Sequence, residues 1–299
     1  EVQVSGLPKN PKIANVSWSP NEQKIAFTNT TNTGVELWFI NVVSAEATKI
    51  TDANLNANLG SPYNWMIDNE TLLVKILPKN RPALIDVKKD LPKGPTVMIS
   101  DGSKSQNRTY PDLLKNKVDE DNFDALVTSE LYKVSLSGAI ELFKSQAIYT
   151  GESYSPDGNY LLLTTIKKPY SYIVPLSRFP QTTTVYDNSG NEIKVVNDVP
   201  LSEIMPKGFS SVRKGKRNMS WRSDKPATLS YVIALDEGDQ ANKVAFRDEL
   251  FQWEAPFTSE ATSITKIQQR FSGIIWGNET LAIVYDDWYD TRNTKTYLI

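Results

Sequence analysis

The sequence predicts an all-β protein built as a β-propeller, and a repeated local pattern carries this prediction. An aromatic residue followed by a turn and a short apolar run occurs five times, starting at Trp18, Trp65, Tyr154, Trp221 and Trp276. These starts lie 47, 89, 67 and 55 residues apart, and a four-stranded propeller blade takes about 40–50 residues. Several of the units are followed by two short segments in which apolar and polar residues alternate, joined by a short turn. The outer strands of a blade would show this pattern.

The two clearest copies, residues 18–27 and 154–163, are predicted β-hairpins. Each places Ser-Pro directly after the aromatic residue, and proline at this position holds φ close to the value that a turn requires. The apolar run that follows has the length and composition of a buried strand. An ordinary β-sandwich with chance internal similarity is the alternative, and the repeated register of aromatic residue, turn and strand argues against it.

The whole chain, residues 1–299, is expected to be one propeller portion of four to five blades. The predicted blade units are approximately 15–60, 61–145, 146–215, 216–270 and 271–299, the last of them incomplete. Propellers close about four to eight blades into a ring, and the chain ends on an apolar strand pattern. We therefore expect a part of a seven- or eight-bladed ring.

Residues 78–125 are predicted to be a loop and helical insertion, with a blade or a lid as the alternatives. The first part is rich in Pro, Lys and Gly, although residues 94–100 could form a strand or a docked extended segment. Residues 112–123 have helical character, and the acidic run Asp119-Glu120-Asp121 is expected to be a solvated turn. A calcium loop would alternate oxygen ligands around a glycine, and this spacing is missing.

Composition excludes several classes of function. The formal net charge of −2 gives no indication of nucleic-acid binding, and no run of 18 apolar residues predicts a membrane span. Cysteine and histidine are both absent, so neither a Ser-His-Asp nor a Cys-His arrangement can be built from this chain. We predict no catalytic residues, no metal site and no cofactor. The first residue is Glu1, which suggests a processed mature protein or an excised fragment.

Several longer stretches carry a family likeness that covers almost the whole chain. Residues 165–180, 209–217, 221–229 and 284–292, together with 110–115 and 119–124, resemble the glutamyl endopeptidase branch of the prolyl oligopeptidase family of serine peptidases. The resemblance implies an N-terminal propeller that precedes a catalytic α/β-hydrolase domain, which this chain does not contain. It further implies a propeller that gates access for peptide substrates. Relatives of this branch are often exported or sent to organelles, and we expect a secreted or periplasmic location.

Three arginines are candidate substrate contacts. Arg213 and Arg217 belong to the densest basic cluster, residues 213–217, and Arg178 follows two tyrosines in a proline-rich turn. Arginine binds carboxylates in a bidentate manner, so these residues are predicted to attract acidic peptides at the domain interface. A solvated loop or a salt bridge between blades is the alternative for Arg213 and Arg217, and a packed loop crossing is the alternative for Arg178.

The remaining sequence features that could suggest a function have simpler structural explanations. The tryptophans at the start of the units, Trp18, Trp65, Trp221 and Trp276, are expected to pack in the blade cores. Asp286, Asp287 and Asp290 could suggest glycoside cleavage, but adjacent residues of a strand point to opposite faces. Six Asn-x-Ser/Thr sequons fit chance in a chain rich in these residues. A stand-alone propeller that binds a protein or glycan partner remains the alternative function.

Overall fold

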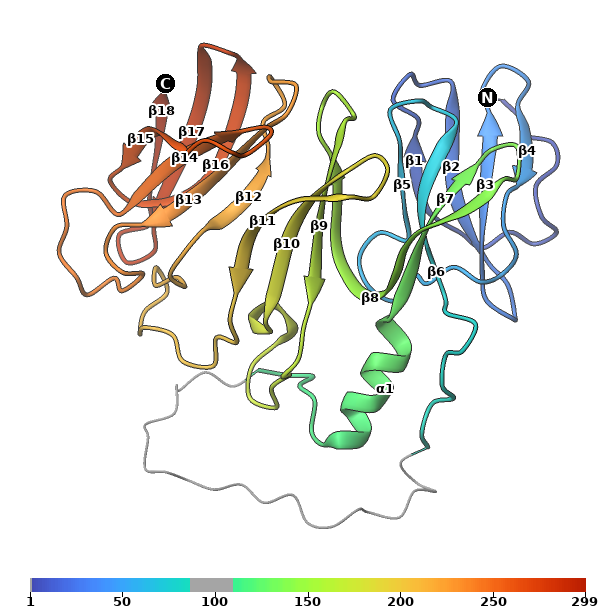
Figure 1. Ribbon diagram of the computed structural model, residues 1–299, viewed down its shortest axis with the longest axis horizontal. Coiled ribbons are helices and arrows are strands. Elements are labelled where there is room, and N and C mark those ends of the chain that lie inside the picture. The colour runs from blue at the N-terminus through green and yellow to red at the C-terminus, as the bar shows by residue number, and fades with distance from the viewer. Residues whose placement is uncertain (1, 87–109) are drawn as a thin grey trace.

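The computed structural model describes residues 2–86 and 110–299, and its architecture is a propeller arc. Antiparallel sheets follow one another around the arc, from β1–β4 at one end to β16–β18 at the other (Figure 1). The prediction of an all-β propeller is confirmed. None of the helices that the structure describes has the length and apolar character needed to cross a membrane.

The first sheet has four strands in chain order, so each strand pairs with the next one along the sequence. Its strands are β1 (Ile13–Trp18), β2 (Lys24–Thr30), β3 (Val35–Asn41) and β4 (Glu46–Lys49).

The predicted turn chemistry is present in both clear copies of the repeat. After β1, the backbone N–H of Glu22 donates to the carbonyl of Ser19 at 2.9 Å, and the Ser19 hydroxyl accepts from the N–H of Lys24. In the second copy, Gly158 and Ser155 make the same backbone bond at 2.8 Å. Glu22 and Gly158 both have positive φ, of 58° and 71°, as this turn requires at that position.

The second sheet contains seven strands and forms two blades that share one long strand. The strands are β5 (Tyr63–Trp65), β6 (Thr71–Ile76), β7 (Ser129–Ser135), β8 (Ile140–Tyr154), β9 (Tyr160–Ile166), β10 (Gln181–Asp187) and β11 (Glu192–Val199). The first half of β8 pairs with β7 and its second half pairs with β9. One strand is therefore the outer strand of one blade and the inner strand of the next.

Two further sheets complete the described arc. The first comprises β12 (Arg217–Trp221), β13 (Thr228–Ala234), β14 (Asp248–Glu254) and β15 (Thr262–Ile267), and the second β16 (Arg270–Asn278), β17 (Leu281–Trp288) and β18 (Asn293–Leu298).

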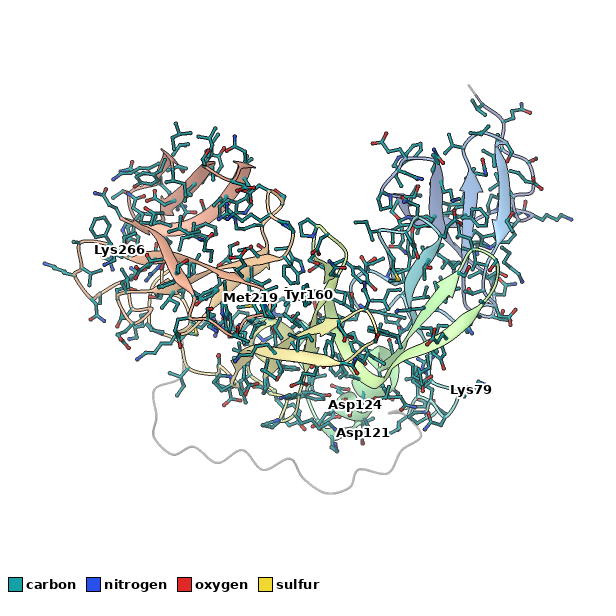
Figure 2. The ribbon with its side chains drawn as sticks, turned by 45° about the horizontal axis from the view of Figure 1, so that its top comes forward. Lys79, Asp121, Asp124, Tyr160, Met219 and Lys266 are labelled. Carbon is teal, nitrogen blue, oxygen red and sulfur yellow. The ribbon has the colours of Figure 1, made fainter. Side chains whose placement is uncertain are left out.

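A separate apolar cluster joins each blade to its neighbour. Each cluster contains buried side chains from two adjacent blades: Ala26 and Leu72, Leu73 and Leu161, Leu162 and Leu229, and Val232 and Val284. Tyr160 and Met219 pack at the third of these junctions and lie close together in Figure 2. Burial of apolar surface between blades is thus the main force that holds the arc together.

The tryptophan prediction is wrong for one of the four residues. Trp65, Trp221 and Trp276 are partly buried and pack against these clusters. Trp18 is instead 54% exposed. Trp18 lies on β1, the innermost strand of the first blade. This strand is largely solvent-accessible, so within the described residues no neighbouring apolar face covers Trp18.

The insertion contains one helix, α1 (Lys117–Val127), which begins later than the predicted helical segment. Asn116 caps the helix, since its side-chain oxygen accepts from the N–H of Asp119 at 2.9 Å. The acidic run is therefore not a turn, because Asp119 and Glu120 lie in the first helical turn, where the helix dipole favours negative charge. The strand predicted at 94–100 lies outside the described residues.

Candidate functional site

The loops that carry Arg178 and Arg213, and the start of β12 with Arg217, lie on the same side of the arc as helix α1. We call this side the helix face. It includes the β9–β10 connection, residues 167–180, and the β11–β12 connection, residues 200–216, both at the lower side of Figure 1 with α1. In an antiparallel arc the same ends of successive blades share one face, so the β17–β18 turn lies there as well.

Helix α1 anchors the β9–β10 connection. The Lys168 ammonium group lies 2.7 Å from the Asp124 carboxylate, and the Tyr170 hydroxyl also donates to Asp124. Burial and the neighbouring Asp124 carboxylate raise the pKa of Tyr170, so this hydroxyl stays protonated. The Tyr170 ring stacks on Phe179 at 5.2 Å, and it is therefore a packing residue of this crossing.

Arg178 ends a short 3₁₀ turn, η1 (Leu176–Arg178), in the same connection. Its guanidinium carbon lies 5.3 Å from the centre of the Tyr110 ring, a cation–π distance. The Arg178 carbonyl accepts the N–H of Ser202 at 3.0 Å, which links this connection to the next one. Its predicted contact with substrate stays a prediction.

The other two predicted arginines are turned toward the protein. Arg213 is half-buried and donates to the carbonyls of Lys214 and Lys216, while burial lowers the pKa of its guanidinium. Arg217 is buried, and its guanidinium lies 2.6 Å from the Asp248 carboxylate. The structure thus places both in contacts within the fold, and it does not bring them together with Arg178 in a common pocket of the described residues.

Asp248 belongs to a buried ionic network between the last two sheets. Arg270, on β16, contacts Asp248 at 3.0 Å and Asp236 at 2.6 Å, and all three side chains are almost completely buried. Arg247 also pairs with Asp236, at 2.8 Å. Sequence reasoning missed this network because its members lie far apart along the chain.

The aspartates considered for glycoside cleavage do not converge. Asp286 is fully buried, where it accepts from the Tyr297 hydroxyl at 2.9 Å, whereas Asp287 is exposed. This alternation along β17 is the one expected of neighbouring strand residues. Asp290 instead accepts a hydrogen bond from Gln240 in the turn that follows.

An exposed aromatic pair on the helix face was also missed. Phe209, in the β11–β12 connection, is 66% exposed and stacks on Tyr289 with ring centres 4.2 Å apart. The Arg292 guanidinium carbon lies 3.7 Å from the centre of the Tyr289 ring. Both segments belong to the stretches that carry the family likeness, but nothing in the sequence indicated that they touch.

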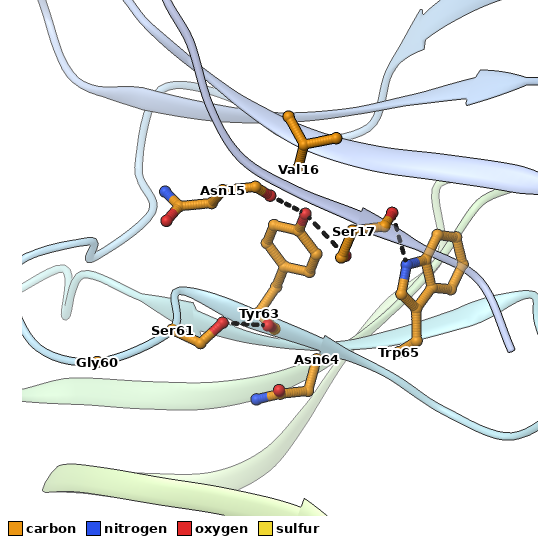
Figure 3. A pocket seen from close by; sticks show the side chains of 8 residues that line it. All are labelled: Asn15, Val16, Ser17, Gly60, Ser61, Tyr63, Asn64 and Trp65. Atoms are coloured by element: carbon orange, nitrogen blue, oxygen red, sulfur yellow. Dashed lines mark hydrogen bonds between the residues drawn. The ribbon is translucent and has the colours of Figure 1, made fainter.

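A polar cavity of about 450 Å³ lies between the inner strands of the first two blades (Figure 3). It is lined by uncharged residues, namely Asn15, Val16, Ser17, Gly60, Ser61, Tyr63, Asn64 and Trp65. The Tyr63 hydroxyl contacts the carbonyl oxygens of Asn15 and Ala26 and accepts from the Ser17 hydroxyl at 3.1 Å. Tyr63 therefore fastens β1 to the second blade.

Replacing Tyr63 by phenylalanine is expected to lower the free energy of unfolding by about 1–3 kcal/mol, because the carbonyl oxygens of Asn15 and Ala26 lose the one hydroxyl donor that they share. Burial raises the pKa of Tyr63 to about 12 against an unfolded value of about 10. The folded chain thus holds this proton more tightly, and the resulting stabilisation is complete below pH 10 and lost as the pH rises to 12.

Thermal unfolding between pH 8 and pH 12 checks both statements. The difference between the wild type and Tyr63→Phe should shrink above pH 10. The exposed Tyr172, whose hydroxyl bonds Glu120 at 3.1 Å, provides the matched control, and Tyr172→Phe should change little. Equal losses in the two variants would contradict the role assigned to Tyr63.

No cluster that could ligate a metal ion occurs among residues 2–86 and 110–299. The residues that the sequence does supply for chemistry are hydroxyls, carboxylates, lysines and arginines, without imidazole or thiol. The described surfaces can therefore bind and orient a ligand, but they do not present a nucleophile paired with a histidine base.

Comparison with known proteins gives two close relatives in sequence. The chain is 38% identical over 311 aligned residues to a protein of Oryza sativa subsp. japonica named "Probable glutamyl endopeptidase, chloroplastic". It is 37% identical over 312 aligned residues to a protein of the same name from Arabidopsis thaliana. Both alignments cover all of this chain, which spans about a third of the length of each relative, 33% and 32%. No family model matches the sequence.

A solved structure supports the fold. Pyrococcus horikoshii acylaminoacyl peptidase matches 96% of this chain and 38% of its own chain, with a TM-score of 0.51 and 11% sequence identity. At this identity the likeness concerns the fold alone. The two plant relatives are named chloroplastic, and the expected secreted or periplasmic location stays a prediction.

Proposed function

The chain is homologous along its full length to one third of the glutamyl endopeptidases, and from this premise we propose that it is the non-catalytic propeller region of a serine peptidase. In this role it gates access to a hydrolase domain and contributes contacts to peptide substrates. The single observation that carries the proposal is the 38% identity over the complete chain.

The physical character of the chain agrees with a role in access and binding. Apolar clusters join each blade to the next, and buried ion pairs reinforce two of these junctions, which favours a rigid propeller over a set of independently moving sheets. A firm propeller can exclude folded proteins from an enclosed site while it admits short or unfolded peptides. The absence of histidine and cysteine leaves the chemistry to residues outside this chain.

Expression of the full-length gene product beside the 299-residue chain tests the proposal. The full-length protein should cleave peptides after glutamate and react with a fluorophosphonate probe, which labels activated serines. The 299-residue chain should do neither. Short peptides should be cleaved by the full-length protein, and a folded protein with exposed glutamates should be left intact.

Two results would refute the proposal. Fluorophosphonate labelling of the 299-residue chain would show that it contains an activated nucleophile. A full-length product that neither cleaves peptides nor reacts with the probe would favour the alternative of a binding scaffold.

A further inference from the structure

An exposed stack on the helix face combines two aromatic rings with an arginine. Phe209 is 66% exposed and Tyr289 is 36% exposed, although large aromatic side chains are usually well covered in a folded protein. Their rings stack at 4.2 Å, and the Arg292 guanidinium carbon lies 3.7 Å from the Tyr289 ring centre. Stacking on a ring restricts the guanidinium in advance, so less side-chain entropy is lost when it binds a ligand.

Buried contacts fix the position of this stack. Ser210, next to Phe209, is buried, and its hydroxyl accepts the N–H of Tyr289 at 3.1 Å. The Ser210 carbonyl accepts from Arg270 at 2.6 Å, and its N–H donates to the Gln240 side chain at 2.9 Å. The exposed rings therefore stand on a rigid base, which connects the β11–β12 connection to the β17–β18 turn.

Gly208 allows the loop to approach this base closely. Its φ is +106°, and a Cβ at this position would lie 2.0 Å from the Gln240 side chain. The positive φ at Gly208 favours glycine, and a Cβ there would also displace the Gln240 side chain that accepts from Ser210. The local structure holds Phe209 outward while its neighbour Ser210 is buried.

The charge around the stack favours an acidic ligand. Residues 207–217 contain five cations and no acidic side chain. Lys214 is already paired with Glu237 at 2.6 Å, and Arg217 is paired with Asp248. Arg292 is exposed, and within the described part of the chain no carboxylate lies within 4.0 Å of its guanidinium. The nearest acidic residue along the turn, Asp290, accepts a hydrogen bond from Gln240.

We propose that Arg292, stacked on Tyr289 beside Phe209, binds the carboxylate of an acidic side chain in a peptide substrate. This inference rests on the proposed function and assigns the acidic-residue contact to a position other than the arginines predicted from sequence. The guanidinium edge is free to donate two parallel hydrogen bonds to one carboxylate, a geometry that a lysine cannot reproduce. Phe209 supplies apolar contact area to the chain that bears the carboxylate.

The test measures binding by the full-length gene product independently of cleavage. The probes are two fluorescein-labelled pentapeptides that differ only in a central glutamate or glutamine, each with a methylated amide nitrogen after that residue to block hydrolysis. Fluorescence anisotropy gives Kd for each peptide. Arg292→Gln should weaken binding of the glutamate peptide about 5- to 10-fold and leave the glutamine peptide unchanged.

Matched variants separate a specific contact from a general effect of charge or folding. Lys214→Gln removes a cation from the same face whose charge is already paired, and it should change neither Kd. Arg292→Lys should recover only part of the glutamate preference, and Phe209→Ala should weaken both peptides. Unchanged thermal unfolding of Arg292→Gln would confirm that the exposed residue has no structural role.

An unchanged ratio of the two Kd values in Arg292→Gln would overturn the inference. If both Kd values rose by the same factor, Arg292 would contact another part of the parent protein and not the glutamate side chain. Failure of the proposed function is a different result. If the full-length protein had no peptidase activity but still showed the Arg292-dependent preference, the inferred binding site would stand and the proposed peptidase function would be refuted.

Discussion

Replacing Arg270 by methionine is expected to lower the free energy of unfolding by about 3–5 kcal/mol. Arg270 lies on the inner strand of the last sheet and contacts two carboxylates of the preceding blade, Asp236 in the β13–β14 connection at 2.6 Å and Asp248 on β14 at 3.0 Å. Both carboxylates are completely buried, so removal of the guanidinium leaves negative charge without water or a full set of partners. The same substitution removes the donor to the Ser210 carbonyl.

Urea unfolding followed by tryptophan fluorescence measures this loss. Arg292→Met is the matched control, because it exchanges the same atoms at an exposed position, and it should stay within about 0.5 kcal/mol of the wild type. Loss of the junction between the last two blades should also unfold β16–β18 first, which hydrogen exchange would detect. A change below about 1 kcal/mol for Arg270→Met would contradict the role of the network.

Replacing Lys75 by methionine is expected to have an effect of similar size, about 3–5 kcal/mol at pH 8. The Lys75 ammonium group on β6 lies 2.7 Å from the Glu152 carboxylate on β8, and both side chains are at most 4% exposed. Lys75 also donates to the carbonyls of Leu59 and Tyr149, so it joins the second and third blades. Without this cation, Glu152 is a buried carboxylate with no compensating charge.

The pH dependence of the stability loss in Lys75→Met tests whether the uncompensated Glu152 carboxylate causes it. Burial raises the pKa of Glu152, while Lys75 lowers it, so the Lys75→Met variant should raise it further. A raised pKa in the folded state gives stability that is present below the unfolded pKa and lost as the pH rises through the folded value. Lys75→Met should therefore be less destabilised at pH 4 than at pH 8.

The double variant Lys75→Met/Glu152→Met provides the control. It removes both charges at once, and it should recover most of the stability lost in Lys75→Met, because a buried pair replaced by apolar side chains is often close to neutral. If the double variant were as unstable as Lys75→Met, the loss would come from packing and not from the uncompensated carboxylate.

Features set by contacts within a few residues were predictable from the sequence, whereas features set by contacts between distant residues were not. The hairpin units at Trp18 and Tyr154 were predictable because Ser19 and Ser155 satisfy a turn within five residues of chain. The helix of the insertion was placed several residues too early, because its start depends on the cap at Asn116. The exposure of Trp18 could not be read locally, since it depends on what packs against the first blade.

At the candidate site, too, the contacts between residues far apart in the sequence could not be predicted. Arg217 was predicted as a substrate contact from the basic cluster, but its charge is paired with Asp248, 31 residues later. Phe209 and Tyr289 are 80 residues apart, and neither carries a local signal that it will lie beside the other. Only the packing of adjacent blades brings these side chains together.

The sequence by itself determined the repeating hairpin, the all-β propeller class and the lack of an imidazole or thiol for catalysis, because turn chemistry, alternation and composition act over a few residues. The tertiary structure alone decided which charges are buried in pairs, as Arg217 and Arg270 are, and which stay exposed with no carboxylate partner among the described residues, as Arg292 does. The physical reason is that the free energy of a charged side chain depends on its desolvation and its partners, and both are set by blades that meet only in the folded chain.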